Sequence, residues 1–131
     1  MRLLLDTHIA LWTVVDSPRL PRRARALVAA DSAVLFVSAV SLWEIAIKHA
    51  RPRGAPDDMP VSAEQMMQFL AEAQCEVLPV TPSHVLEVEA LPRLHGDPFD
   101  RMLVAQARVE PLRLVTADRQ LAAYGENVEL V

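Results

Sequence analysis

Short, mostly apolar runs alternate with segments of helical periodicity along the whole sequence, and this alternation constrains the fold more than any other feature. The runs that predict strands lie at residues 3–5, 33–37, 76–80, 112–116 and 128–131. Between them, apolar residues recur at helical spacing. Continuous apolar strands are typical of a parallel sheet that helices cover on both faces. We therefore expect an α/β fold with three α/β/α layers around a central parallel sheet of four to five strands.

Length and composition favour one domain spanning residues 1–131, since 52% of the residues are hydrophobic and 23% are charged. No apolar run approaches transmembrane length, and the first residues lack a signal-peptide apolar region. We therefore expect a cytoplasmic protein with no membrane partner. A lone Cys75 excludes an intrachain disulfide and a cysteine zinc site, and it predicts a small buried hydrophobe.

The formal net charge of −4 argues against a protein that coats nucleic acid without specificity. Basic residues nevertheless cluster at residues 19–25 and 48–53. Each cluster is either a solvated helix face or part of a local track for phosphates. Charge alone leaves both interpretations open.

The segment at residues 95–107, HGDPFDRMLVAQA, joins an apolar helix to two carboxylates. Asp97 followed by Pro98 predicts a helix start, because Asp accepts free N–H groups of the first turn and Pro fits the first helical position. Asp100 shares a stripe with Leu103 and Val104, which should face the core. It either binds a cation there or only favours the helix dipole.

Four carboxylates are expected at one edge of the sheet, because ligands bind beyond the carboxyl ends of parallel strands. These four are Asp6, Glu44, Asp100 and Asp118. Convergent acids repel one another unless a counter-charge is present, and Mg²⁺ or Mn²⁺ is the usual one. Such an ion orients a water, lowers its pKa and stabilises charge on a phosphate. The structural alternative is that Asp6 and Asp118 are N-caps and that Glu44 pairs with Ser41 in a capping box.

Neighbouring polar residues have weaker signals. Thr7 and Thr116 adjoin the acids and can bind a metal water, a phosphate or a helix end, and His8 is expected at the rim. Trp12 and Trp43 fall on apolar stripes and are expected in the core. The sequence contains no phosphate-binding glycine loop, no GxSxG and no HExxH, and its histidines show no ligand spacing.

Four motifs carry a resemblance to a known family. They are LLLDTHIALW, SAVSLWEIAIK, HGDPFDRMLVAQA and LVTAD, and they cover nearly the whole chain in order. This chain resembles the PIN-domain ribonucleases and, within them, the VapC-type toxins of bacterial toxin–antitoxin pairs. The loop at residues 51–60 is the least family-like part.

The resemblance implies a PIN-like nuclease domain that cleaves RNA endonucleolytically with Mg²⁺ or Mn²⁺. It also implies a homodimer and a VapB-type antitoxin that wraps the toxin and blocks the site. Within the sequence it assigns the catalytic, metal-binding quartet to Asp6, Glu44, Asp100 and Asp118, with Asp97 and Thr116 as neighbours of it.

A nuclease of negative net charge needs local cations to bring phosphates to an acidic site. Lys48, one turn beyond Glu44, is the first candidate, followed by Arg101 and the arginines at residues 19–23. Single-stranded or loop RNA is the expected substrate, because specific recognition needs accessible bases.

Two other functions remain open on the sequence. A phospho-acceptor regulatory module also uses an acidic pocket and Mg²⁺, but it needs paired acids after the first strand, where this chain has Asp6 and Thr7. A catalytically weak PIN-like binding module is the second alternative, and the intact quartet disfavours it.

Overall fold

The computed structural model describes all residues 1–131. Its sheet has five strands: β1 (Arg2–Leu5), β2 (Val34–Ser38), β3 (Glu76–Leu78), β4 (Arg113–Thr116) and β5 (Val128–Leu130). The strand order is β3-β2-β1-β4-β5, and every neighbouring pair is parallel. The expected α/β fold with a central parallel sheet is confirmed, and the strand count is five.

Helices connect the strands. They are α1 (Thr7–Val14), α2 (Arg22–Val28), α3 (Ala39–Ala50), α4 (Ala63–Glu72), α5 (Pro82–Ala90) and α6 (Pro98–Val109), with a 3-10 helix η1 (Arg119–Tyr124). The short helix expected after Asp118 is therefore present in 3-10 form. No helix is long and apolar enough to cross a membrane.

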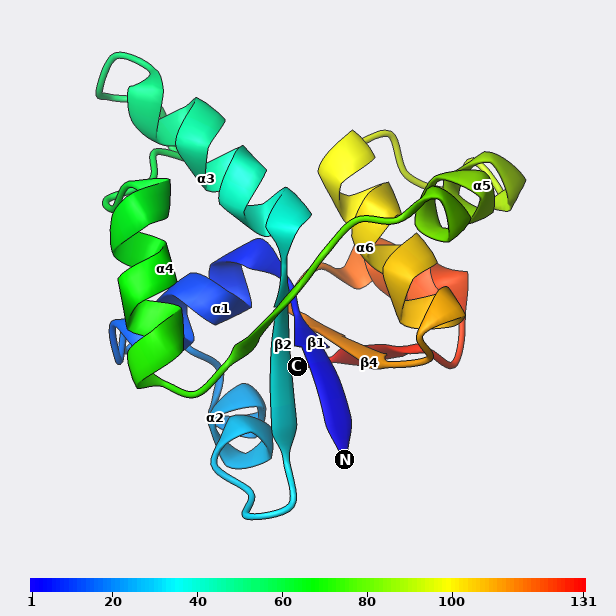
Figure 1. Cartoon of the computed structure of the whole chain (residues 1–131), viewed down its shortest axis with the longest axis horizontal. Helices are drawn as coiled ribbons and strands as arrows, with labels where there is room; N and C mark the ends of the chain where they lie inside the picture. The colour runs from blue at the N-terminus through cyan, green and yellow to red at the C-terminus, as the bar shows by residue number, and fades with distance from the viewer.

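The sheet has a separate hydrophobic core on each face, because successive side chains of a strand point to opposite sides. In β1, Leu3 and Leu5 pack with residues of α1, α2 and α4, whereas Leu4 packs with residues of α6 and η1. Figure 1 shows these layers, with α1, α2 and α4 on one side of β1 and β2 and with α5 and α6 on the other. All three residues are essentially buried, as expected for continuous apolar strands.

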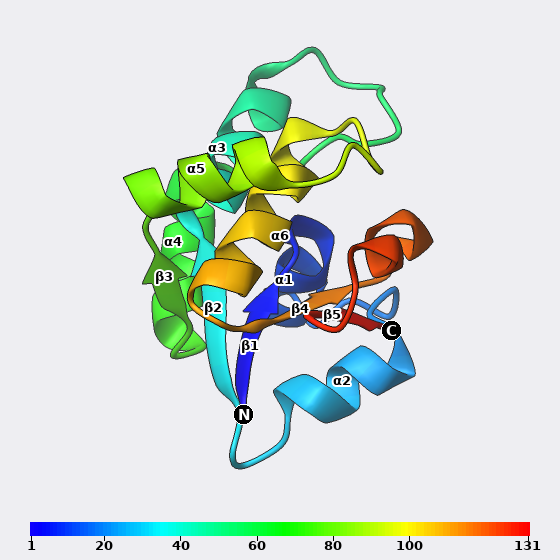
Figure 2. The same cartoon turned by 90° about the vertical axis from the view of Figure 1, so that its right-hand side faces the viewer.

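The order in which strands are added to the sheet reverses at the central strand β1. The next strands, β2 and β3, add on one side of β1, and β4 and β5 add on the other. In Figure 2, β1 and β2 run upward, and α1 and α3 begin at their upper ends. Such a switch point leaves a crevice at the carboxyl edge of the sheet.

One expectation about the core is wrong. Trp43 is 60% exposed and packs edge-on against Phe99, with the ring centroids 5.2 Å apart. The buried stripe of α3 passes through Val40, Glu44 and Ile45, so Trp43 falls outside it. Trp12 packs against the core from a half-buried position, and Cys75 is buried as expected.

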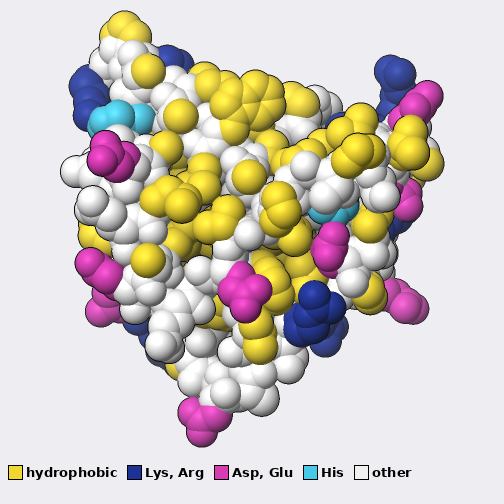
Figure 3. All heavy atoms as spheres, viewed as in Figure 1, with side chains coloured by type: hydrophobic (Ala, Val, Ile, Leu, Met, Phe, Trp, Pro, Cys, Tyr) yellow, Lys and Arg dark blue, Asp and Glu magenta, His cyan; other side chains and the backbone are white.

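Several large apolar side chains are exposed on α3, β3 and α5. Trp43 and Ile47 of α3, Val77 of β3, and Val85 and Leu86 of α5 are all exposed. Figure 3 shows hydrophobic side chains spread over the face that carries β3, between α3 and α5. We call these five residues the apolar face.

Candidate metal centre

A cavity of about 180 Å³ lies at the carboxyl edge of the sheet, and no hydrophobic residue lines it. Its lining residues are Asp6, Thr7, His8, Glu44, Lys48, Asp97, Asp100 and Asp118. We call this cavity the acidic pocket. All four carboxylates of the expected quartet therefore reach one pocket, although they come from four separate segments.

Asp6 combines a helix cap with a buried charge. It is the residue between β1 and α1, and its Oδ1 accepts a hydrogen bond from the Ile9 backbone N–H at 2.9 Å. Its Oδ2 accepts a hydrogen bond of 2.5 Å from the Thr116 hydroxyl, across from β4. Burial raises the pKa of Asp6 to about 6, against the opposing effect of these hydrogen bonds. Asp6 is therefore an N-cap, as the structural alternative predicts, and it also lines the acidic pocket.

Glu44 is buried and has a partner on each oxygen. The Thr7 hydroxyl donates to Oε1 at 2.6 Å, and the Lys48 ammonium donates to Oε2 at 2.6 Å. The capping-box interpretation of Ser41 and Glu44 is wrong. The N-cap of α3 is Ser38, whose hydroxyl accepts from the Val40 N–H, so Glu44 lies in the second turn of the helix.

Asp97 and Asp100 differ in role at the start of α6, and Asp97 begins the helix as the sequence predicts. Asp97 is the N-cap of α6, and its Oδ1 accepts from the backbone N–H groups of Phe99 and Asp100 at 2.8 and 3.1 Å. Pro98 occupies the first helical position. Burial, with a contribution from the Asp97 charge, raises the pKa of Asp100 to about 6.

Asp118 is also a cap that faces the pocket. Its Oδ1 accepts from the Gln120 N–H at 2.9 Å at the start of η1, and its own N–H donates to Thr116 Oγ1 at 3.0 Å. Because Thr116 also donates to Asp6, one hydroxyl links two acids that are 112 positions apart in sequence.

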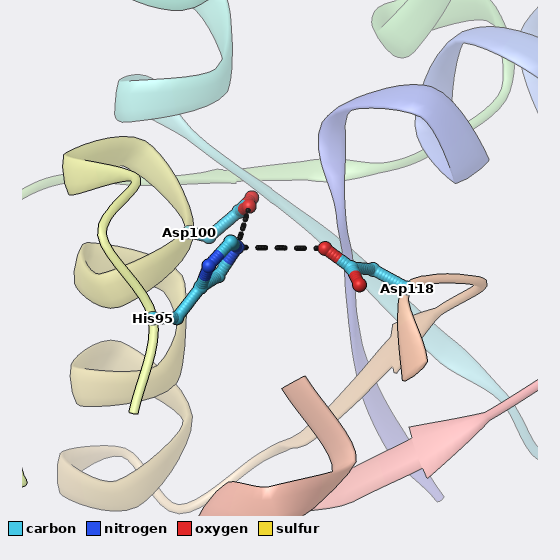
Figure 4. A group of neighbouring side chains, drawn as sticks. All are labelled: His95, Asp100 and Asp118. Carbon is cyan, nitrogen blue, oxygen red and sulfur yellow. Dashed lines mark hydrogen bonds and ion pairs between the residues drawn. The ribbon is translucent and has the colours of Figure 1, made fainter. Parts of the chain in front are cut away.

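Sequence reasoning missed His95. Its Nε2 lies 2.9 Å from Asp100 Oδ2 and 3.4 Å from Asp118 Oδ2, between the two carboxylates (Figure 4). The only signal in the sequence is its position two residues before the cap Asp97. Its second partner, Asp118, is reached only through the tertiary fold.

The two basic candidates differ in position. Lys48 lines the acidic pocket, where it also lies 3.3 Å from Asp57 Oδ2 of the loop at residues 51–60. Arg101 points away from the pocket, and its guanidinium donates to the Pro92 and Val88 carbonyls and to the Tyr124 hydroxyl at 3.0 to 3.1 Å. It lines a neighbouring cavity of about 490 Å³ together with His95.

The donor set of the acidic pocket fits a hard divalent cation. Carboxylate oxygens are the ligands that Mg²⁺ and Mn²⁺ prefer. Asp6 and Asp100 both have pKa values raised to about 6, chiefly by burial, so their ionised forms need a counter-charge. A bound divalent cation would supply that charge.

The sequence model of the PIN domain matches residues 3–127. This chain belongs to the PIN-domain family. Ribonuclease VapC22 of Mycobacterium tuberculosis is 35% identical over 123 residues, which cover 92% of this chain and 90% of that protein. The chain is thus a VapC-type PIN-domain ribonuclease, and the phospho-acceptor alternative is not supported.

Solved structures share the PIN fold at low sequence identity. VapBC2 from Rickettsia felis, bound to a DNA fragment from its promoter, gives a TM-score of 0.68 at 16% identity and covers 100% of this chain and 98% of its own. A toxin–antitoxin complex from Klebsiella pneumoniae gives a TM-score of 0.66 at 18% identity, with 97% and 95% covered. These likenesses extend to the fold alone.

Proposed function

We propose that the acidic pocket hydrolyses RNA phosphodiester bonds with Mg²⁺ or Mn²⁺. The observation that carries this proposal is the convergence of Asp6, Glu44, Asp100 and Asp118 on one pocket without a hydrophobic lining residue. RNA is the substrate because the relative VapC22 is a ribonuclease. Cleavage is endonucleolytic, and the protein is the toxin of a VapBC-type pair.

When bound, the ion supplies a water of lowered pKa and positive charge for the phosphate oxygens. The chain's own residues orient the ligands. Thr116 and the Ile9 N–H fix the two oxygens of Asp6, and Thr7 fixes Glu44. Lys48 offsets the charge of Glu44 and offers a contact for a substrate phosphate.

The partner of this toxin is a VapB-type antitoxin. Two of the structural neighbours are described as toxin–antitoxin or VapBC assemblies. An antitoxin that covers the acidic pocket would have to offer cationic side chains to it, because every acid of the quartet lines the pocket. Blockage at the site itself therefore predicts basic antitoxin side chains in the acidic pocket.

Asp100→Asn is the direct test. The variant keeps the size of the side chain and removes one negative ligand, so metal-dependent cleavage falls by at least about a hundredfold while the protein stays folded. The assay incubates purified protein with total cellular RNA and Mg²⁺ and maps the new ends. Circular dichroism and a thermal melt establish folding.

Glu72→Gln at the end of α4 provides a matched control, because Glu72 is an exposed acid outside the pocket. It should cleave RNA like the wild type. Cleavage that persists in excess chelator, or in Asp100→Asn, contradicts the proposal.

We further propose that two copies associate through the apolar face. Five large apolar side chains exposed together are unusual on a protein that stays monomeric. Trp43→Glu should shift the mass measured by light scattering from dimer to monomer at micromolar concentration. Arg22→Glu on the distant α2 should leave the mass unchanged, and a wild-type monomer would contradict the proposal.

A further inference from the structure

His95 brings the only nitrogen donor that lies between two acids of the pocket. Its Nε2 and one oxygen each from Asp100 and Asp118 all lie within 4.8 Å of one another. Ligands held about 2.1 Å from a single ion are separated by about 3.0 Å when adjacent and about 4.2 Å when opposite. The measured separations of 2.9 and 3.4 Å from Nε2 are close to the adjacent spacing.

These three atoms have no partners outside their own cluster. The Oδ2 atoms of Asp100 and Asp118 contact only His95, and Nε2 contacts only them. By contrast, both oxygens of Asp6 and both oxygens of Glu44 already accept hydrogen bonds from protein groups. The group formed by His95, Asp100 and Asp118 therefore has more free coordinating capacity than Asp6 or Glu44.

We propose that His95 is a direct ligand of the ion and that it makes this site bind Mn²⁺ in preference to Mg²⁺. The inference rests on the proposed metal-dependent function and deepens it. Imidazole is a good ligand for first-row transition metals, whereas Mg²⁺ binds through oxygens and keeps its waters. A nitrogen ligand thus adds affinity for Mn²⁺ and little for Mg²⁺.

The position of His95 suits this role. The residue lies in the segment between α5 and α6, two positions before the cap Asp97, and its side chain is only 15% exposed. In Figure 4 the ring points from this segment toward Asp118, which follows β4. The His95 imidazole therefore connects Asp100 of α6 with Asp118, which follows β4 on the other side of the switch point.

The competing role for His95 is that of a cation substitute. In that case the ring balances Asp100 and Asp118 only while the ion is absent, and the ion has to displace it. The two roles predict opposite effects of removing the ring. As a ligand, His95 contributes to metal affinity; as a substitute, it competes with the metal.

The experiment titrates purified wild-type protein, His95→Ala and His8→Ala with Mn²⁺ and follows free Mn²⁺ by electron paramagnetic resonance. His95→Ala should weaken Mn²⁺ binding by at least about tenfold, because even groups that only hydrogen-bond a ligand often account for 10- to 100-fold. Mg²⁺ affinity, measured by competition with Mn²⁺ and corrected for each variant's own Mn²⁺ affinity, should change by less than about threefold.

Pulsed electron paramagnetic resonance then identifies the ligand. Modulation from a directly coordinated ¹⁴N should be present in the wild type and in His8→Ala and absent in His95→Ala. His8 is the matched control because it is the histidine that lines the acidic pocket, and its ring packs against Trp12 with the ring centroids 5.7 Å apart.

Tighter Mn²⁺ binding by His95→Ala, or a wild-type spectrum without ¹⁴N modulation, overturns the inference. Either result leaves the proposed nuclease intact if Asp100→Asn still abolishes RNA cleavage. If wild-type protein neither binds Mn²⁺ nor cleaves RNA, both the inference and the proposed function fail.

Discussion

Two aspartates of the pocket serve a helix and the proposed ion at once. Asp6 and Asp118 each use Oδ1 to cap the element that follows, while Oδ2 of Asp6 accepts from the Thr116 hydroxyl and Oδ2 of Asp118 lies 3.4 Å from His95. A cap needs an oxygen acceptor but no negative charge, whereas an ionised carboxylate binds a divalent cation more strongly than a neutral amide oxygen does. Substitutions that separate the acceptor from the charge therefore separate the two roles.

Asp6→Asn and Asp6→Ala form such a pair. Asparagine retains an oxygen for the Ile9 N–H and removes a buried charge, so the metal-free variant at pH 7.5 should be as stable as the wild type or more stable. Alanine also loses the cap and should be about 1 kcal/mol less stable than Asp6→Asn. Urea unfolding in the presence of chelator measures the stability of both variants. Equal stability of Asp6→Asn and Asp6→Ala would contradict the role of Asp6 as both a cap and a buried charge.

The pairing of α5 with α6 depends on polar side chains for which no structural role was predicted from the sequence. Fully buried His84 accepts from the Thr81 N–H through Nδ1, and its Nε2 lies 2.6 Å from Glu110. Arg101 joins the last turn of α5 and the segment after it to Tyr124. The expectation that Arg101 contacts substrate stays a prediction, and its geometry favours a structural role.

Arg101→Ala distinguishes these roles. Removing the guanidinium leaves two carbonyls and one hydroxyl without their donor, so we expect the free energy of unfolding to fall by about 2 kcal/mol. The KM for RNA should not change at temperatures where the variant is folded. Arg22 is an exposed arginine without an ion pair, so Arg22→Ala is the control and should leave the free energy of unfolding unchanged. A raised KM with unchanged stability would restore the substrate role.

Features that depend on residues close in sequence were predicted well. Contacts that form only in the tertiary fold were not predicted. The cap at Asp97 depends on residues three or fewer positions apart, and it is present. The capping box predicted at Ser41 is absent because the N-cap of α3 lies three residues earlier, at Ser38. His95 could not be found, because its relation to Asp118 exists only after β4 joins β1.

At the scale of the whole molecule, the acidic pocket makes stability depend on pH. Asp6 and Asp100 have pKa values near 6 in the fold and near 3.8 without it. A raised pKa in the native state stabilises the fold fully below the unfolded value, and this contribution is lost as pH rises through the folded value. Between pH 4 and pH 7 these two acids therefore make the metal-free protein progressively less stable.

Thermal melts in chelator should show this dependence. The melting temperature of the wild type should fall between pH 5 and pH 7.5 relative to that of the double variant Asp6→Asn, Asp100→Asn, which lacks both groups. Added Mn²⁺ should raise the wild-type melting temperature more at pH 7.5 than at pH 5, because protons compete with the ion for the carboxylates. Identical pH profiles for the two proteins would contradict the pKa shifts.

The hydroxyl bridge from Thr116 to Asp6 has a consequence for synthesis of the protein on the ribosome. The bridge spans 110 positions, and the walls of the pocket extend from Asp6 to Asp118. A nascent chain that ends before β4 lacks both the bridge and one carboxylate, and parallel pairing over such separations is slow. The ribosome that translates this protein is therefore not exposed to a finished acidic pocket until nearly the whole chain has emerged.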